Sequence, residues 1–162
     1  MKQQLEAIYL SHRQALFSLA LSTTGCAAMA EDAVHEAFVR LCRLSPTSPS
    51  EQLVAYVFAA VRNAAIDAGR RLQSQKKLAE TIFQMRGSKS TEGVSENDDQ
   101  TEMLRTAVEA LEQPAREVVI LKVYGALTFE QIGQVLEIPA ATAATRYRRA
   151  LTHIEDALRN RT

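Results

Sequence analysis

The chain has 162 residues, of which 46% are apolar, and it carries 19 basic and 19 acidic side chains. This length fits one ordinary domain or two small ones, and the scarcity of glycine and proline favours helices over a β-sandwich or barrel. No run approaches the ~20 apolar residues of a membrane span, and the N-terminus lacks a signal-peptide core. We therefore expect a cytoplasmic protein without membrane insertion. The two cysteines and three histidines are scattered, so no metal or other cofactor is expected.

Three helices are predicted in the first half of the chain. The first covers residues 2–23 and the second runs from about Ala30 to Leu44. The third begins near Glu51, after a loop with two prolines, and reaches the early eighties. Each has one apolar stripe for a shared core. The expected core residues are Leu5, Ile8, Tyr9, Leu16, Leu19 and Ala20, then Ala30, Ala33, Val34, Ala37, Leu41 and Leu44, and finally Val54, Val57, Phe58, Val61, Ala65, Ala68 and Leu72.

The second helix has more apolar side chains than one core stripe needs. Phe38, Val39 and Cys42 lie on another side, near Asp32 and His35. An apolar patch rimmed by polar groups is typical of a protein-binding surface. The same residues would equally suit a second buried face of a central helix in a bundle, and both interpretations stay open.

The third helix combines an aromatic ring, an amide and basic groups opposite its core stripe. This face carries Tyr56, Asn63, Ile66 and Arg70, with Arg62 and Arg71 at its sides. An aromatic ring can stack on an unpaired base, an amide can bond to a base edge, and guanidinium groups can hold phosphates. The alternative is that Tyr56 and Ile66 pack against another helix of the same domain.

Residues 86–101 contain almost no apolar side chain. Such a segment cannot repay the entropy lost on ordering. We therefore predict a flexible polar linker at 86–101, between helical domains at 1–85 and 102–162. The acidic residues of this region separate two basic stretches, so the formal net charge of zero does not exclude nucleic-acid binding.

The second domain is predicted to begin with a helix near residues 101–111. Pro114 then suits the first turn of a second helix, and Gly125 suits the C-terminal end of that helix. Both residues are common at such positions because proline lacks an amide hydrogen and glycine tolerates unusual backbone angles.

A helix-turn-helix is predicted next. Thr128 and Gln131 have the spacing of a capping box, which marks the start of a short helix. Ile138-Pro139 makes the turn, and a last helix runs from about Ala140 to Leu158. In a helix-turn-helix of this kind the second helix enters the major groove of DNA.

The last helix separates an apolar side from a polar and basic side. Its expected core stripe is Ala143, Tyr147, Ala150, Leu151, Ile154 and Leu158. Thr142, Thr145 and Arg149 point the opposite way, flanked by Arg146 and Arg148. Short polar groups and guanidinium groups on one face suit contacts with base edges and phosphates. The alternative is a solvated basic face on an ordinary surface helix.

Together these segments resemble a bacterial sigma factor of the small, two-domain extracytoplasmic-function type, over most of the chain. Ala30–Leu41 is similar to the polymerase-docking helix of that family, and Ala55–Asp67, followed by Arg70-Arg71, to its promoter-melting helix. Leu111–Arg116 and the helix-turn-helix resemble its sigma-4 domain. The resemblance implies an all-α fold, in which a sigma-2-like bundle and a sigma-4-like domain are joined by the linker. It also implies promoter-specific initiation with core RNA polymerase, which itself performs the chemistry.

The resemblance further implies a role for each candidate residue. Asp32, Glu36, Phe38 and Val39 would dock on the clamp helices of the polymerase β′ subunit. Tyr56, Arg62, Asn63, Arg70 and Arg71 would open and hold the −10 promoter element. Thr142, Thr145, Arg146 and Arg149 would read the −35 element in duplex form, with Arg148 on phosphate. The β flap and an anti-sigma factor are further candidate partners.

The sequence departs from the family pattern at a few positions. His35 stands where the family usually has Gln, and Tyr56 where Trp is common. Ala141 and Ala144 occupy positions often filled by Gly or Asn and by Lys, which predicts a shallower salt dependence of DNA binding. The main alternative function is a dimeric helix-turn-helix regulator that binds paired half-sites without docking on polymerase. A helical adaptor without a DNA role and an enzyme are more distant alternatives.

Overall fold

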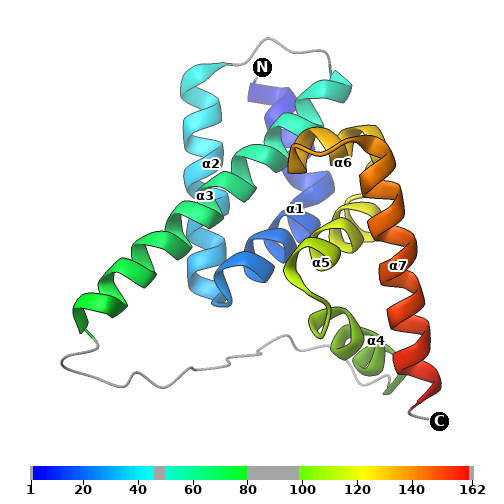
Figure 1. Ribbon diagram of the computed structural model, residues 1–162. Helices are drawn as coiled ribbons and strands as arrows, with labels where there is room; N and C mark the ends of the chain where they lie inside the picture. Colours follow the sequence, from blue (N-terminus) through cyan, green and yellow to red (C-terminus); the bar gives the residue numbers. More distant parts are fainter. Residues whose placement is uncertain (1, 46–49, 80–98, 161–162) are drawn as a thin grey trace. The chain divides into compact units, whose positions relative to one another are not determined.

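A computed structural model of the chain describes residues 2–45, 50–79 and 99–160 (Figure 1). All regular structure in these ranges is helical, and no strand occurs in them. The chain divides into two compact units, residues 1–91 and 92–162. The predicted all-α fold with two helical domains is confirmed. Most of the predicted linker at 86–101 lies outside the described residues, and its boundaries stay a prediction.

The first unit is a bundle of three helices, α1 (Lys2–Thr24), α2 (Ala27–Leu44) and α3 (Ser50–Ala79), each of which packs on the other two. Gly25 follows α1 with a φ of +69°, a left-handed conformation that glycine adopts without steric cost. Helix α2 begins three residues earlier than predicted. The predicted continuation of α3 into the early eighties lies outside the described residues.

The core of the first unit follows the predicted stripes, with several exceptions. Leu44 is 69% exposed and Tyr9 is 41% exposed, so neither belongs to the core. Leu44 is the last residue of α2, where the neighbouring helices no longer cover it. The ring of Tyr9 instead meets the ring of Phe38 edge-on, with the ring centres 5.3 Å apart. Val54, Ala68 and Leu72 are only half-buried, whereas Leu53, Ala55 and Ala64 are buried without having been predicted.

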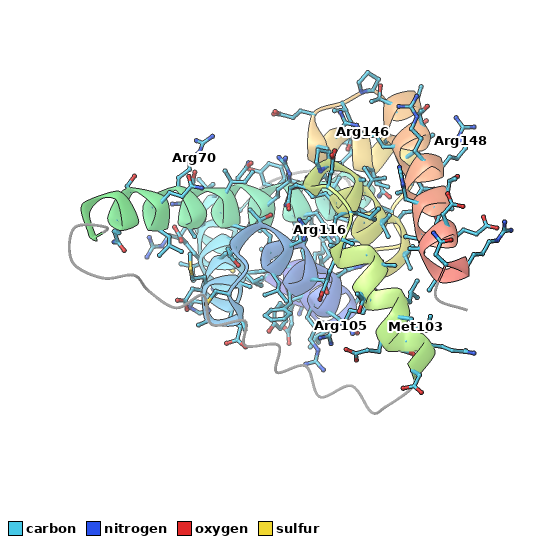
Figure 2. All side chains as sticks on the ribbon, turned by 60° about the horizontal axis from the view of Figure 1, so that its bottom comes forward. Arg70, Met103, Arg105, Arg116, Arg146 and Arg148 are labelled. Carbon is cyan, nitrogen blue, oxygen red and sulfur yellow. The ribbon has the colours of Figure 1, made fainter. Side chains whose placement is uncertain are left out.

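Helix α3 extends past the part of the bundle that buries it (Figure 1). Its last fully buried residue is Ala65, and Arg70 and Arg71 are exposed, as are residues 73–75. Arg70 projects from the helix away from α1 and α2 (Figure 2). Arg70 and Arg71 therefore form a basic surface on α3 that is open to solvent.

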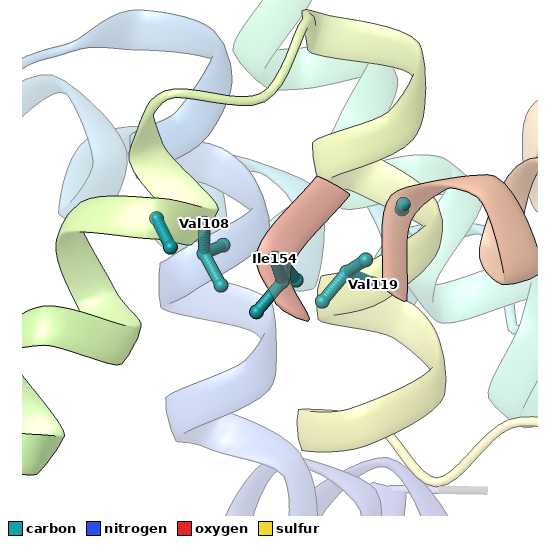
Figure 3. Close-up of a cluster of buried hydrophobic side chains, with 5 residues drawn as sticks. Val108, Val119 and Ile154 are labelled. Carbon is teal, nitrogen blue, oxygen red and sulfur yellow. The ribbon is translucent and has the colours of Figure 1, made fainter. Parts of the chain in front are cut away.

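The second unit consists of α4 (Asp99–Glu109), α5 (Gln113–Val119), the π-helical turn η1 (Ile120–Tyr124), α6 (Phe129–Leu136) and α7 (Ala140–Arg159). Helix α7 packs against α4, α5 and α6. Val108, Val119 and Ile154 point toward one another in the core (Figure 3), together with Ala107 and Ala150. Helix α4 begins and ends two residues earlier than predicted. Asp99 and Glu102 in its first turn stabilise the positive end of the helix dipole, which favours the earlier start.

The helix predicted from Pro114 to Gly125 is present, but its last part is π-helical. The amide of Gly125 donates to the Ile120 carbonyl at 3.0 Å, which closes a wider turn than in an α-helix. Gly125 itself keeps a right-handed conformation, whereas Ala126 is left-handed with a φ of +55°. The left-handed residue after η1 is thus Ala126, one position later than the glycine predicted to end the helix.

Candidate nucleic-acid interface

The helix-turn-helix is built from α6, a short turn and α7. The predicted capping box is confirmed. The backbone amide of Gln131 donates to Thr128 Oγ1 at 3.1 Å, and the backbone amide of Thr128 donates to Gln131 Oε1 at 2.9 Å. Glu137 ends α6 in a left-handed conformation with a φ of +58°. Pro139 then precedes the first residue of α7 as the predicted turn requires.

Gly133 lets the turn fold back tightly on α6. A β-carbon at this position would lie 2.6 Å from the carbonyl oxygen of Ile138 and 3.4 Å from the amide nitrogen of Ala140. The Ile138 amide also donates to the Gly133 carbonyl at 3.0 Å. The angle between α6 and α7 therefore depends on the absence of a side chain at Gly133.

The buried side of α7 is narrower than predicted. Ala143, Ala150 and Ile154 are buried, and Tyr147 and Leu158 are half-buried against the core. Leu151 is 41% exposed and does not belong to the core stripe. The buried arc of α7 therefore includes Ala143 and Ala150 but does not extend to Leu151.

The opposite side of α7 has the predicted polar and basic character. Arg148 and Arg149 are exposed, whereas Thr142, Thr145 and Arg146 are half-buried. Arg148 projects away from the rest of its unit (Figure 2). The Thr145 hydroxyl donates to the Ala141 carbonyl at 3.0 Å, so it presents its methyl group and an acceptor lone pair to a ligand. No acidic residue occurs in α7 before Glu155.

The predicted base-contacting face of α3 is accessible. Tyr56 is 44% exposed, and Asn63 is also exposed, whereas Arg62 and Ile66 are half-buried. Neither Tyr56 nor Ile66 is fully covered by another helix, and the alternative that both pack against a neighbouring helix stays open. Tyr56 and Asn63 line a cavity of about 210 Å³ between α2 and α3. Its other lining residues are Ala37, Arg40, Leu41, Leu44, Ala59 and Ala60.

The predicted protein-binding side of α2 lies beside a larger groove. Val39 and Asp32 are exposed, and Phe38 and Glu36 are half-buried. Glu36 forms an ion pair with Arg40 at 2.8 Å on the same helix. The groove, of about 850 Å³, runs between α1 and α2, and its apolar lining includes Tyr9, Phe17, Val34 and Phe38.

Sequence reasoning missed the contribution of α1 to this groove. Tyr9 and Phe17 are eight residues apart, and hence near one face of α1, but periodicity alone assigned Tyr9 to the core. Phe38 is half-buried against Tyr9 of α1, whereas Val39 and Cys42 on the same side of α2 are exposed.

Three sets of candidate residues thus lie together, each within a single unit. The arginines of α7 flank Thr142 and Thr145, Tyr56 and Asn63 share one cavity, and Phe38 lies in a groove that also reaches the exposed side of α2. Within the described ranges no helix is long and apolar enough to cross a membrane. In the same ranges no three His, Cys, Asp or Glu side chains converge as metal ligands.

Comparison with known families assigns both units. The family model for Sigma-70 region 2 matches residues 8–75, which comprise most of α1 to α3. The model for Sigma-70, region 4, matches residues 101–154, which include the helix-turn-helix. Curated proteins compared with the chain show no match.

A solved structure shows the same fold over nearly the whole chain. It is the co-crystal structure of the sigma factor RpoE with the anti-sigma factor NepR from Bartonella quintana. The TM-score is 0.72 at 20% sequence identity, with 98% of this chain and 96% of that chain covered. Family matches and fold therefore agree with the resemblance read from the motifs. The chain belongs to the sigma-70 family and is a sigma factor, which binds core RNA polymerase and directs promoter-specific transcription initiation.

Proposed function

We propose that this sigma factor grips a promoter at two points, with α7 on the −35 duplex and α3 on the opened −10 element. The observation that carries the proposal is that α7 has a buried alanine-rich side and a more exposed arginine side. It follows α6, whose start is fixed by a capping box. The division into domains at 1–85 and 102–162, with a linker at 86–101, would let each domain engage its own element.

On the −35 element, Thr142, Thr145, Arg146 and Arg149 read base edges, and Arg148 holds phosphate. Guanidinium groups bond bidentately to guanine in the major groove, and the threonine methyl groups suit contact with thymine methyls. The exposure of Arg148 and Arg149 supports contacts made without rearrangement of the unit. The small side chains of Ala140, Ala141 and Ala144 allow a close approach of the helix to the groove.

At the −10 element, the cavity beside Tyr56 and Asn63 receives an unpaired base. Its lining is apolar except for Arg40, Asn63 and the hydroxyl of Tyr56, so a base could stack on the ring while its edge bonds to the amide. Arg62, Arg70 and Arg71 then hold the neighbouring phosphates. Exposure of Arg70 and Arg71 on the free end of α3 supports this role.

Docking on polymerase uses the exposed side of α2. Asp32, Glu36, Phe38 and Val39 contact the β′ clamp helices, and the second unit contacts the β flap. The groove beside Phe38 supports this assignment because it offers apolar surface for a partner helix. The protein acts in the cytoplasm and supplies no catalytic residue, since polymerase performs the chemistry. We extend to this chain, as a proposed partner, an anti-sigma factor like the one bound to RpoE.

The roles of α7 at the −35 element and of α3 at the −10 element can be tested separately, by measuring duplex binding and strand opening with the holoenzyme. Arg149→Ala should weaken initial promoter binding about tenfold, because a bidentate base contact is worth roughly 1–3 kcal/mol. Asn63→Ala should leave initial binding unchanged and reduce opening, as read by permanganate reactivity of unpaired thymines. Arg105→Ala on α4 controls for the loss of a positive charge, and Gln4→Ala on α1 controls for the loss of an amide.

Equal effects of Arg149→Ala and Asn63→Ala on both steps would contradict the assigned roles. A symmetric footprint on paired half-sites without core polymerase would instead favour the dimeric regulator.

A further inference from the structure

Three side chains from separate elements of the second unit form a continuous row. The Lys122 ammonium of η1 lies 4.4 Å from the centre of the Phe129 ring. The Phe129 ring centre lies 5.6 Å from that of Tyr147, with an angle of 58° between the ring planes. Lys122 Nζ also donates to the Leu127 carbonyl at 3.2 Å. We name Lys122, Phe129 and Tyr147 the stacked row.

The stacked row joins the start of α6 to the middle of α7. Phe129 is the first residue of α6, directly after the capping residue Thr128. Tyr147 lies between Arg146 and Arg148 on α7, and it packs against the core around Ile154. Lys122 holds both the backbone that enters α6, through the Leu127 carbonyl, and the first ring of that helix.

Lys122 is better placed to orient these helices than to contact DNA. The residue as a whole is half-buried, and its ammonium donates to a carbonyl and lies over an aromatic ring. A cation over a ring stabilises more strongly when it is partly shielded from water. A phosphate would be a third partner for an ammonium that already donates to a carbonyl and lies over a ring.

We propose that Lys122 is a positioning residue for DNA recognition, which acts through Phe129 and Tyr147 to set the orientation of α7 against α6. It thereby holds Arg146 and Arg149 in register with the major groove. This inference rests on the proposed −35 function of α7 and adds a residue outside the helix-turn-helix to it.

The test uses the holoenzyme on a promoter fragment that it transcribes, obtained from start sites mapped on fragmented genomic DNA. Lys122→Met keeps the aliphatic stem but removes the charge, Lys122→Arg keeps a cation, and Arg105→Met controls for charge loss elsewhere in the unit. Lys122→Met should weaken promoter binding about three- to tenfold, and Lys122→Arg should stay within about twofold of wild type. In a Phe129→Leu background, Lys122→Met should cause a clearly smaller loss than in the wild type, because only the bond to the Leu127 carbonyl is left to remove.

The salt dependence distinguishes positioning from direct contact with DNA. A positioning residue leaves the slope of log affinity against log salt unchanged, whereas loss of a phosphate contact lowers its magnitude by about one. A lowered slope, or losses that multiply in the double variant, would overturn the proposal. If wild-type holoenzyme shows no −35 protection, the proposed function fails. If the wild-type holoenzyme protects the −35 element but Lys122→Met binds the promoter as tightly as the wild type, only the positioning role fails.

Hydrogen exchange in the free protein tests without DNA whether Lys122 holds the start of α6. The amides of Thr128 and Gln131 are bonded within the capping box. Lys122→Met should speed their exchange several-fold relative to Lys122→Arg and Arg105→Met. Unchanged exchange at both amides would show that Lys122 does not hold the start of α6.

Discussion

Substitution of Gly133 by valine tests the packing that orients the two helices of the helix-turn-helix. Valine is about 0.3 kcal/mol more favourable than glycine inside a helix, so without a clash Gly133→Val would slightly stabilise the second unit. The structure places the new β-carbon 2.6 Å from the Ile138 carbonyl oxygen, a backbone atom that cannot rotate away. Such overpacking costs roughly 1–3 kcal/mol. We therefore expect a net loss of about 1–3 kcal/mol in the free energy of unfolding.

The unfolding of the second unit is measured in the full chain by following its own NMR resonances, such as those of Val108 and Ile154, through a denaturant titration. Gln134→Val is the matched control, because Gln134 is the next residue of α6 and is exposed. It should change stability by only a few tenths of a kcal/mol. Equal stability of Gly133→Val and Gln134→Val would refute the close approach of the turn to α6.

Three further predictions concern single residues. Glu137→Gly should stabilise the second unit by about 0.5–1 kcal/mol, because glycine removes the cost of the left-handed conformation at the exposed end of α6, and lower stability in denaturant unfolding would contradict this. Burial lowers the pKa of His12 below 6.5, so the folded state binds fewer protons than the unfolded chain in acid. The first unit should accordingly lose stability as the pH falls below about 6.5, and His12→Leu should flatten this loss in thermal unfolding at a series of pH values; an unchanged pH slope would count against it. Ile154→Ala should cost about 2–5 kcal/mol in denaturant unfolding of the second unit, and a loss below about 1 kcal/mol would show that its core is loosely packed.

Local signals in the sequence predicted local structure well. Thr128 and Gln131 lie three residues apart, and the side chain of each accepts a hydrogen bond from the backbone amide of the other. No distant element is needed for these bonds. The same holds for Pro114 in the first turn of α5, since proline acts through its own backbone angles.

Errors arose where burial depends on the extent of a neighbouring helix. Helical periodicity identifies the side of a helix that faces the core, but it does not show how far the neighbouring helix covers that side. Leu44 and Leu151 have the correct spacing and still lie outside the core. Tyr9 shows the same effect, because its ring meets Phe38 at the surface of the bundle.

The features that position the candidate site were beyond sequence reasoning. The stacked row joins Lys122 to Tyr147, 25 residues later, and no local pattern indicates that these side chains approach the same ring. The π-helical turn before Ala126 likewise has no signal in the sequence, and the glycine at 125 precedes the residue that is left-handed. Both depend on how α5, α6 and α7 pack together.

The measurement that tests the two-point grip most directly is transcription of fragmented genomic DNA by core polymerase with and without this protein, followed by mapping of the start sites. We expect a set of new starts that share one motif in the −35 region and one in the −10 region. Arg149→Ala should relax the first motif, and Asn63→Ala the second. Starts that share no upstream motifs, or no starts beyond those made by core polymerase alone, would contradict it.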